Sequence, residues 1–241
     1  MFTVALIGPD GAGKSTITKQ IVERFPVPVK YLYMGVNLEA SSLVLPTTRL
    51  ILEIKRARGG RPDFTGPPDP EKNHFQSKGG AKRIFRELKT GLRLMNLMAE
   101  EWFRQLAVWF YLKRGYIVVF DRHFFTDYYA YDVIKTTKPR PLINRVHGFM
   151  LGHLYPKPDL VIFLDAPPEV LFNRKGEGSL RLLERRRQEY LGLRNVFQDF
   201  HKIDASQSEE KVFEQVADLI WDYYNARNDS VLKVDWKKWA S

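Results

Sequence analysis

The stretch VALIGPDGAGKST, from Val4 to Thr16, decides how the rest of the chain folds. An apolar run from Phe2 to Ile7 leads into its glycines, and such a run is typical of a strand buried on both faces of a parallel sheet. Beyond the glycines, apolar residues recur at helical spacing until Pro26, namely Ile17, Ile21, Val22 and Phe25. The sequence therefore predicts a strand, a glycine loop and a helix in direct succession.

The loop matches the pattern G-x-x-x-x-G-K-[ST], which is that of a P-loop. Its glycines let backbone N–H groups wrap a phosphate, and the first turn of the next helix adds unpaired amides and a positive dipole end. We expect Lys14 to reach the β- and γ-phosphates and the Ser15 hydroxyl to bind Mg²⁺. The predicted ATP-binding residues are Gly8, Asp10, Gly11, Ala12, Gly13, Lys14, Ser15 and Thr16.

Three further apolar runs predict strands of the same sheet. They span Val29–Met34, Tyr116–Phe120 and Leu160–Leu164, and helical or irregular segments separate them. This alternation is typical of βαβ units, so the predicted class is α/β, a P-loop NTPase fold whose parallel sheet is flanked by α-helices. We expect residues 1–241 to form a single domain, with a helical or mobile insertion and a lid.

A long helical stripe lies between Ala81 and Arg114. Its apolar residues recur at helical spacing, so we expect them to face the core, with a break in the helix at Gly91. The stripe comprises Ile84, Leu88, Leu92, Met95, Met98, Trp102, Leu106, Trp109 and Phe110.

The segment from Gly59 to Gly80 is rich in glycine and proline and has basic flanks. Such a composition predicts a mobile loop, either a solvated linker or a lid or docking surface for an anionic ligand. Residues 227–241 form a C-terminal tail in which Trp236 and Trp239 can pack on the body or on a second subunit. A homodimer is therefore one option for the protein's partner.

Composition limits the partners and the compartment. Lysine and arginine number 38 against 28 aspartates and glutamates, a net charge of +10 that favours polyanions such as nucleotides. The chain has no cysteine and no apolar run long enough to span a bilayer. We therefore expect a soluble cytoplasmic protein with nucleotide substrates rather than nucleic acid as its partner.

Asp121, Arg122 and His123 follow the third predicted strand. An aspartate at the carboxyl end of a parallel strand is well placed to hold Mg²⁺, and an arginine beside it can bind a phosphate through two N–H groups. We expect Asp121 and Arg122 to be functional, and His123 to serve packing or hydrogen bonding.

The sequences GPDGAGKST, DRH and PDLVIFLDAPPEV occur in this order, and the chain resembles the thymidylate kinase family of P-loop nucleoside monophosphate kinases. The resemblance implies that Asp10 contacts the acceptor's sugar hydroxyl. It also implies that Asp121 serves Mg²⁺ and that Arg122 binds the acceptor phosphate. The segment TDYYAYD is similar to the family's Ser-x-x-Ala-Tyr-Gln, which places Thr126 and Tyr131 at the acceptor, although it is one residue longer and ends in Asp132.

The chain departs from that family after the second strand. The family has an Arg-Glu-Pro motif there whose arginine binds the acceptor phosphate, whereas this chain reads YLYMGVNLEASSLVLPTTR. Arg49 is the candidate replacement. The acceptor is therefore thymidylate, another nucleotide or a sugar derivative.

A basic segment, residues 174–188, predicts the family's lid. The P-loop itself contains no arginine, so the cation that stabilises the transferring phosphoryl group has to come from this lid. We rank Arg174 and Arg185 first and Arg181 next, because Arg181 and Arg185 share a face of the expected helix while Arg186 and Arg187 turn away. The alternative is a charged, solvated helix.

These features favour an ATP- and Mg²⁺-dependent kinase that acts on a small phosphorylated acceptor. The alternatives are a kinase for a different small molecule, and a catalytically weak nucleotide-binding module that uses its basic surface for a partner. Intact Lys14, Ser15 and Asp121 favour the kinase, whereas the missing Arg-Glu-Pro motif keeps the module in consideration.

Overall fold

A computed structural model describes residues 1–35, 37, 41–57, 59, 80–133, 142–176 and 178–227 of the chain. The sequence-based predictions for the Gly59–Gly80 loop and for Trp236 and Trp239 of the tail fall almost wholly outside these ranges. Within them, no helix is both long and apolar enough to cross a membrane.

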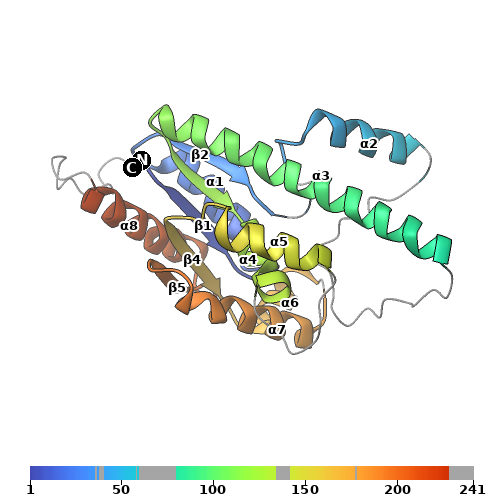
Figure 1. The fold of residues 1–241 in the computed structure, drawn as a ribbon. Helices are drawn as coiled ribbons and strands as arrows, with labels where there is room; N and C mark the ends of the chain where they lie inside the picture. The colour runs from blue at the N-terminus through green and yellow to red at the C-terminus, as the bar shows by residue number, and fades with distance from the viewer. Residues whose placement is uncertain are drawn as a thin grey trace.

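Five parallel strands form one sheet in the order β2-β3-β1-β4-β5 (Figure 1). In chain order they are β1 (Thr3–Ile7), β2 (Val29–Tyr33), β3 (Ile117–Asp121), β4 (Leu160–Asp165) and β5 (Phe200–Asp204). Together with the flanking helices, this sheet confirms the α/β P-loop NTPase fold. Since the strands are parallel, their carboxyl ends meet at one edge, where β1 leads into the glycine loop and β3 ends at Asp121.

Alternate side chains of each strand feed two separate hydrophobic layers. Val4 and Leu6 of β1 pack with α1 (Lys14–Arg24) and α8 (Glu209–Arg227) on one face of the sheet. Ala5 and Ile7 pack toward the other face, which is covered by α3 (Gly80–Lys113), α4 (Phe124–Tyr128) and α5 (Leu142–His153) (Figure 1). The continuous apolar runs seen in the sequence are therefore strands buried from both sides.

Shorter elements connect the strands and the long helices. The π-helix η2 (Tyr129–Val133) extends α4, and α2 (Pro46–Ala57) joins α3 through a hydrogen bond from Thr48 Oγ1 to Asn96 Oδ1 of 3.1 Å. The chain then forms α6 (Pro168–Lys175), α7 (Leu180–Leu191) and the 3₁₀ turn η3 (Gly192–Asn195) between β4 and β5. Ser179 caps α7 by accepting a hydrogen bond from the backbone N–H of Leu182.

The prediction that the apolar stripe of α3 faces the core is wrong for five of its nine residues. Leu92, Met95 and Leu106 are 58%, 67% and 58% exposed, and Trp109 and Phe110 are exposed as well. The buried residues of this helix are mostly charged or polar, namely Glu100, Glu101, Arg104 and Gln105, with Val108 beside them. Their partners come from distant parts of the chain, so the helical period was correct but the inner face was misassigned.

Two other differences concern element boundaries. No break occurs at Gly91, because α3 continues through it, and open space surrounds that position. Strand β5 was not predicted, because its sequence FHKID buries Ile203 while His201 and Lys202 are exposed. An edge strand of this kind lacks the apolar run that identifies an internal strand.

The two-layer core predicts how much each side chain contributes to the free energy of unfolding. Phe213 of α8 is fully buried, whereas Phe172 of α6 is 38% exposed. Phe213→Ala should lower the free energy of unfolding by about 3–5 kcal/mol, because it leaves a cavity between α8 and the sheet. Phe172→Ala is the matched control and should cost less than about 1.5 kcal/mol. Urea denaturation of the two variants tests this, and equal losses would contradict the assignment of α8 to the core.

Candidate active site

The glycine loop between β1 and α1 depends on close backbone approaches. Gly8 and Gly11 have φ values of 148° and 88°. A Cβ atom on Gly8 would lie 2.6 Å from the Leu164 carbonyl oxygen, and one on Gly11 would lie 2.5 Å from that of Leu171. Any larger residue would therefore push the loop away from the end of β4 and from α6.

Lys14 starts α1 and folds back over this loop. It is buried, and its Nζ donates hydrogen bonds to the carbonyl oxygens of Gly8 at 2.8 Å and Pro9 at 2.7 Å. Burial and the nearby Arg122 lower the pKa of Lys14 to about 8, although Asp10 and two other aspartates oppose the shift. The ammonium group thus remains mostly charged at neutral pH and lies inside the loop that would hold phosphates.

Ser15 and Asp121 meet beside Lys14. The Ser15 hydroxyl donates to Asp121 Oδ2 at 2.5 Å, and the Tyr31 hydroxyl lies 3.4 Å from the same oxygen. Asp121 Oδ1 is buried and has no hydrogen-bond partner among the described residues. A hydroxyl and a carboxylate with an unused oxygen form a hard-oxygen donor set, which fits Mg²⁺. The described residues contain no cluster of three or more His, Cys, Asp or Glu that could hold a metal alone.

Asp10 gathers cations from three other elements. Arg122, which follows β3, forms a short ion pair with its Oδ1, and Lys175 Nζ of α6 lies 3.7 Å from the same atom. Arg186 Nη1 of α7 lies 3.1 Å from Oδ2. Although burial alone would raise the pKa of Asp10, these cations and Lys14 lower it to about 2. The Asp10 carboxylate is therefore ionised at neutral pH.

Arg122 is held in a rare backbone conformation. Its φ of 66° lies in the left-handed region, which few residues other than glycine adopt. Its backbone N–H donates to the Leu6 carbonyl oxygen at 3.1 Å, so β1 fixes the turn. Such outliers concentrate at functional sites, and this one directs the guanidinium group toward the glycine loop.

The lid segment is helical, as expected, but a different face of α7 points at the site. Arg186 reaches Asp10, and its Nε is buried without a hydrogen-bond partner among the described residues. Arg181 is exposed, and Arg185 is half-buried and donates from Nε to Glu189 Oε1 at 3.1 Å. Arg187 forms a two-pronged ion pair with Asp165 at the end of β4, at 2.5 and 3.0 Å. The expectation that Arg186 and Arg187 turn away is wrong.

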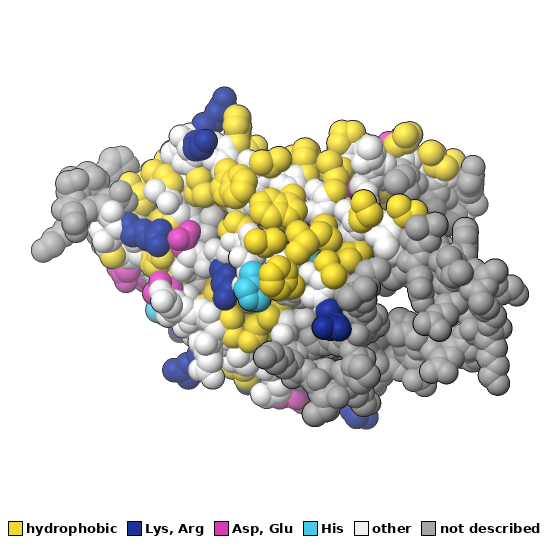
Figure 2. All heavy atoms as spheres, viewed as in Figure 1, with side chains coloured by type: hydrophobic (Ala, Val, Ile, Leu, Met, Phe, Trp, Pro, Cys, Tyr) yellow, Lys and Arg dark blue, Asp and Glu magenta, His cyan; other side chains and the backbone are white. Residues whose placement is uncertain are grey.

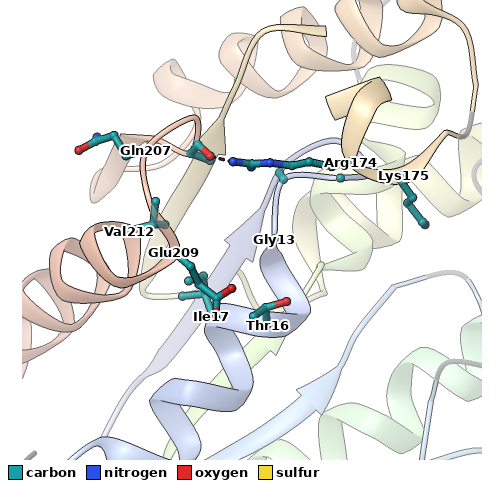
Figure 3. Close-up of a pocket in the computed structure, with 11 residues that line it drawn as sticks. Gly13, Thr16, Ile17, Arg174, Lys175, Gln207, Glu209 and Val212 are labelled. Carbon is teal, nitrogen blue, oxygen red and sulfur yellow. Dashed lines mark hydrogen bonds between the residues drawn. The ribbon is translucent and has the colours of Figure 1, made fainter. Parts of the chain in front are cut away.

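Arg174 lies on the opposite side of the glycine loop. It lines a cavity of about 360 Å³ together with Gly13, Thr16, Gln207 and Val212, between the loop and the start of α8 (Figure 3). Its Nη1 donates to the Ala205 carbonyl oxygen at 2.7 Å, which ties α6 to the loop after β5. The cavity adjoins the glycine loop, and Asp121 is not among the residues that line it.

The residues predicted for the acceptor do not all gather. Thr126 is buried in α4, and its hydroxyl donates to the His123 carbonyl oxygen at 2.7 Å, so it stabilises the turn after β3. Tyr131 lies in η2. Arg49 is exposed on α2, and no described contact joins it to Asp10 or Arg122. Burial lowers the pKa of His123 to about 3, which agrees with a structural role.

Sequence reasoning missed one arginine, one ion pair and one carboxylate of the site. Arg186 and the Arg187–Asp165 pair depend on the rotation of α7 about its axis, which no local pattern sets. The third is Asp127 of α4, a buried carboxylate near Arg122 and Lys14. Its location seven residues beyond a predicted strand, next to Thr126, was the available signal.

Comparisons with known proteins agree with this geometry. Residues 86–216 match the family described as thymidylate kinase. The "Probable thymidylate kinase" of Archaeoglobus fulgidus is 25% identical over 232 residues, which cover 94% of this chain and 98% of that protein. The "Probable thymidylate kinase 1" of Saccharolobus solfataricus is 28% identical over 115 residues, 45% of this chain and 57% of that protein. Because the family match covers more than half of the chain, including the strand that presents Asp121 and Arg122, this protein belongs to the thymidylate kinase family.

Proposed function

We propose that the protein is a kinase that transfers the γ-phosphoryl group of ATP to the phosphate of a nucleoside monophosphate, with dTMP as the first candidate. The observation that carries this proposal is the convergence of Arg122, Lys175 and Arg186 on Asp10, beside Lys14 and Ser15. Phosphoryl transfer needs cations positioned around a compact, highly charged group rather than a covalent catalyst. The names of the relatives support dTMP as the acceptor to test first.

The donor nucleotide is assigned to the cavity beside the glycine loop. Its phosphates would lie in the loop near Lys14, and its base would extend toward Arg174 and Gln207 (Figure 3). A guanidinium group can stack on a planar base, and a side-chain amide can donate to its edge. This direction leaves the Asp10 and Arg122 side free for the acceptor.

Ser15 and Asp121 are the residues that would hold Mg²⁺. When bound, this ion neutralises charge on the phosphates and orients them. Asp121 contributes from the rigid end of β3, with Tyr31 and Ser15 holding its Oδ2. Magnesium usually keeps several waters and shares its remaining positions with substrate phosphates, which agrees with a protein donor set of only these two groups.

The acceptor is assigned to the space around Arg122 and Asp10, with Thr126 and Tyr131 nearby in sequence. Arg122 can bind an acceptor phosphate with two parallel N–H groups, and Asp10 can accept a hydrogen bond from a sugar hydroxyl. Both residues now bind each other, so the acceptor would exchange one ion pair for two new contacts. Arg49 remains a candidate only if α2 approaches the site when substrate binds.

Arg186 is our choice for the lid cation. Among the described lid arginines, it is the one whose guanidinium reaches Asp10, and this contact supports a role at the point where the phosphoryl group would pass between donor and acceptor. Arg174 faces the donor cavity, Arg181 is exposed, and Arg185 is half-buried and pairs with Glu189. Arg187 holds α7 against β4 through Asp165 and thereby positions its neighbour.

A different phosphorylated acceptor is the second candidate, and the segment after β2 favours it. Tyr31 and Tyr33 are followed there by Gly35, where a Cβ would lie 2.7 Å from Arg122 Cδ. Buried Arg104 holds this segment by donating to the Gly35 carbonyl oxygen at 2.9 Å. The acceptor's base or sugar would thus meet tyrosines rather than the family's Arg-Glu-Pro motif.

A nucleotide-binding module without catalysis is the third option. Nucleotide substrates make the cytoplasm the compartment in which we expect the protein.

We also propose that the protein forms a homodimer through α3 and α5. Figure 2 shows apolar side chains gathered over these helices, and eight of them are 39–67% exposed: Leu92, Met95, Leu106, Trp109, Phe110, Val146, Phe149 and Leu154. Large apolar side chains offer roughly 150–250 Å² each, so this face exposes on the order of 800 Å². That is about the area that one partner buries in a stable interface. A second copy of the chain would cover it symmetrically.

Turnover with a panel of acceptors tests the proposed function. ATP and Mg²⁺ with nucleoside monophosphates, including dTMP, and with sugar phosphates should release ADP above the background with one acceptor. Lys14→Met should lower kcat at least about a thousandfold at an unchanged melting temperature, because it removes phosphate-binding charge while keeping the side-chain length. A sugar phosphate as best acceptor would favour the second candidate. If no acceptor stimulates ADP release, the nucleotide-binding module is the remaining candidate.

The lid cation has its own test. Arg186→Ala should reduce kcat about a thousandfold, because an arginine on the transferring phosphoryl group contributes on the order of 10³–10⁵ in rate. Arg185→Ala is the matched control on the same helix and should stay within about threefold, because an exposed ion pair contributes little. Steady-state kinetics of both variants, with melting temperatures, give the comparison. Full activity of Arg186→Ala would return the role to Arg174 or Arg181.

The dimer is tested by placing a charge in its centre. Met95→Glu should convert a dimer to a monomer, because an uncompensated carboxylate in an apolar interface costs several kcal/mol, of order 2–5. Leu180→Glu, at an exposed apolar position on α7, is the control and should leave the oligomeric state unchanged. Sedimentation velocity across a concentration series measures both. A monomeric wild-type protein at micromolar concentration would refute the interface.

A further inference from the structure

Two carboxylates share the cations of the active site. The charges of Arg122, Lys14 and Arg186 act on Asp10 and also on Asp127. Asp10 bonds directly to Arg122 and Arg186. Among the described contacts, no hydrogen bond joins Asp127 to either arginine. The site therefore contains one carboxylate, Asp10, that pairs directly with the arginines, and a second, Asp127, that makes no described hydrogen bond to them.

Asp127 is unusual in its own surroundings. It lies in α4, is 5% exposed, and its Oδ1 accepts a hydrogen bond from the Tyr190 hydroxyl of α7 at 3.1 Å. Its Oδ2 is buried and has no hydrogen-bond partner among the described residues. Buried polar atoms without partners are rare and ask for an explanation. Since the charges of Arg122, Lys14 and Arg186 act on this carboxyl group, we look for the explanation in the chemistry of the site.

We propose that Asp127 is an acceptor-site residue that works as a neutral carboxylic acid. It takes up one proton from solvent when an anionic acceptor enters among Arg122, Lys14 and Arg186, and Oδ2 then donates that proton in a hydrogen bond to the anion. This inference rests on the proposed function only in placing an anionic acceptor at these cations.

An anion that arrives at Arg122 favours the protonated form of a neighbouring carboxylate. It brings negative charge to a region that already holds two carboxylates, and neighbouring like charges raise each other's pKa. Asp10 keeps its charge, because the surrounding cations hold its pKa at about 2. Burial raises the pKa of Asp127, although Arg122, Tyr190, Lys14 and Arg186 oppose the shift. The proton therefore goes to Asp127, as in other sites where two acids are kept apart by their environments.

The geometry decides which oxygen carries the proton. Tyr190 already donates to Oδ1, so a proton on Oδ2 would face no competing donor. A protonated carboxyl group donates one hydrogen bond and can still accept others. Tyr190 thus holds the carboxyl group in place, while the unpartnered oxygen serves the ligand.

The other groups that face Asp127 leave a clear pH window. Burial lowers the pKa of Lys14 of α1 to about 8, and it raises the pKa values of Tyr33 of β2, Tyr128 of α4 and Tyr190. Arg122 and Arg186 supply permanent positive charge. Below pH 7, Asp127 is the group in this set whose charge can change, because burial raises the pKa of its carboxyl group whereas the surrounding cations hold that of Asp10 at about 2. Since the bound anion favours the protonated form, anion affinity should rise as the pH falls through this window.

Sulfate provides the test, because it is a tetrahedral anion that resembles phosphate but keeps the same charge across this window. Calorimetric titration of sulfate into the full chain, with Mg–ADP in the glycine loop and constant ionic strength, should show saturable binding. Between pH 7 and 5.5 the affinity should rise about three- to tenfold, with net proton uptake when two buffers of different ionisation enthalpy are compared. Asp127→Asn should bind sulfate at pH 7 at least as tightly as wild type, with no proton uptake, because its amide donates without charge.

Two further variants locate and control the effect. Arg122→Ala should abolish sulfate binding, which places the ion in this cluster. Asp132→Asn removes another buried carboxylate, which lies in η2 and bonds to His147 of α5. This variant should keep the wild-type pH dependence. Melting temperatures show that each variant is folded.

Three results would overturn the inference: an unchanged pH dependence in Asp127→Asn, sulfate binding by Asp127→Asn at least about tenfold weaker than wild type, or no saturable sulfate binding by the wild-type protein. The second result would mean that Asp127 acts as a carboxylate that orients Arg122. A silent panel of nucleoside monophosphates, with the sulfate results as expected, would refute the proposed function and leave this inference standing.

Discussion

The Asp10 carboxylate is the counter-charge on which the arrangement of the site depends. Cations from the ends of β3 and α6 and from α7 lie within 4 Å of it, and they would repel one another without it. Because each cation comes from a separate element, their shared attraction to one carboxylate draws these elements toward the glycine loop. Three cationic side chains from separate elements are thus assembled beside the glycine loop around a single carboxylate.

A second ion pair fixes how α7 presents its side chains. Arg187 grips Asp165 with two nitrogens, and Asp165 is almost fully buried at the end of β4. The next residue toward the N-terminus, Arg186, then projects over the loop to Asp10. Two adjacent arginines therefore divide the work, because one fastens the helix to the sheet and the other reaches into the site.

What the sequence could predict was local. The glycine loop, Lys14, Ser15 and the Asp121–Arg122 pair follow from short patterns next to apolar strands, and four of the five strands follow from the same apolar runs. What it could not predict depends on contacts between distant residues. Arg104 is buried because the carbonyl oxygens of Gly35 and Leu43 accept its N–H groups. Without these partners in view, the charged face of α3 looked like the solvent face, and the apolar face looked like the core.

The lid shows the same limit in another form. A run of arginines predicts a cationic helix, but the rotation of that helix about its axis depends on Asp165 of β4, which accepts two hydrogen bonds from Arg187. Asp127 likewise stands out only when Tyr190, far along the chain, is seen to hold one of its oxygens. The contacts that distinguish these residues are thus tertiary, and local sequence patterns do not predict them.

The tight packing at Gly8 and Gly11 has a consequence for how this protein can evolve. Backbone atoms of β4 and α6 occupy the space where side chains at these two positions would begin. An arginine cannot be introduced at position 11 by a single substitution, because α6 would first have to withdraw. Substitutions at this residue are therefore blocked as long as α6 packs against the loop, and the cations around Asp10 come from other elements, namely Arg122, Lys175 and Arg186.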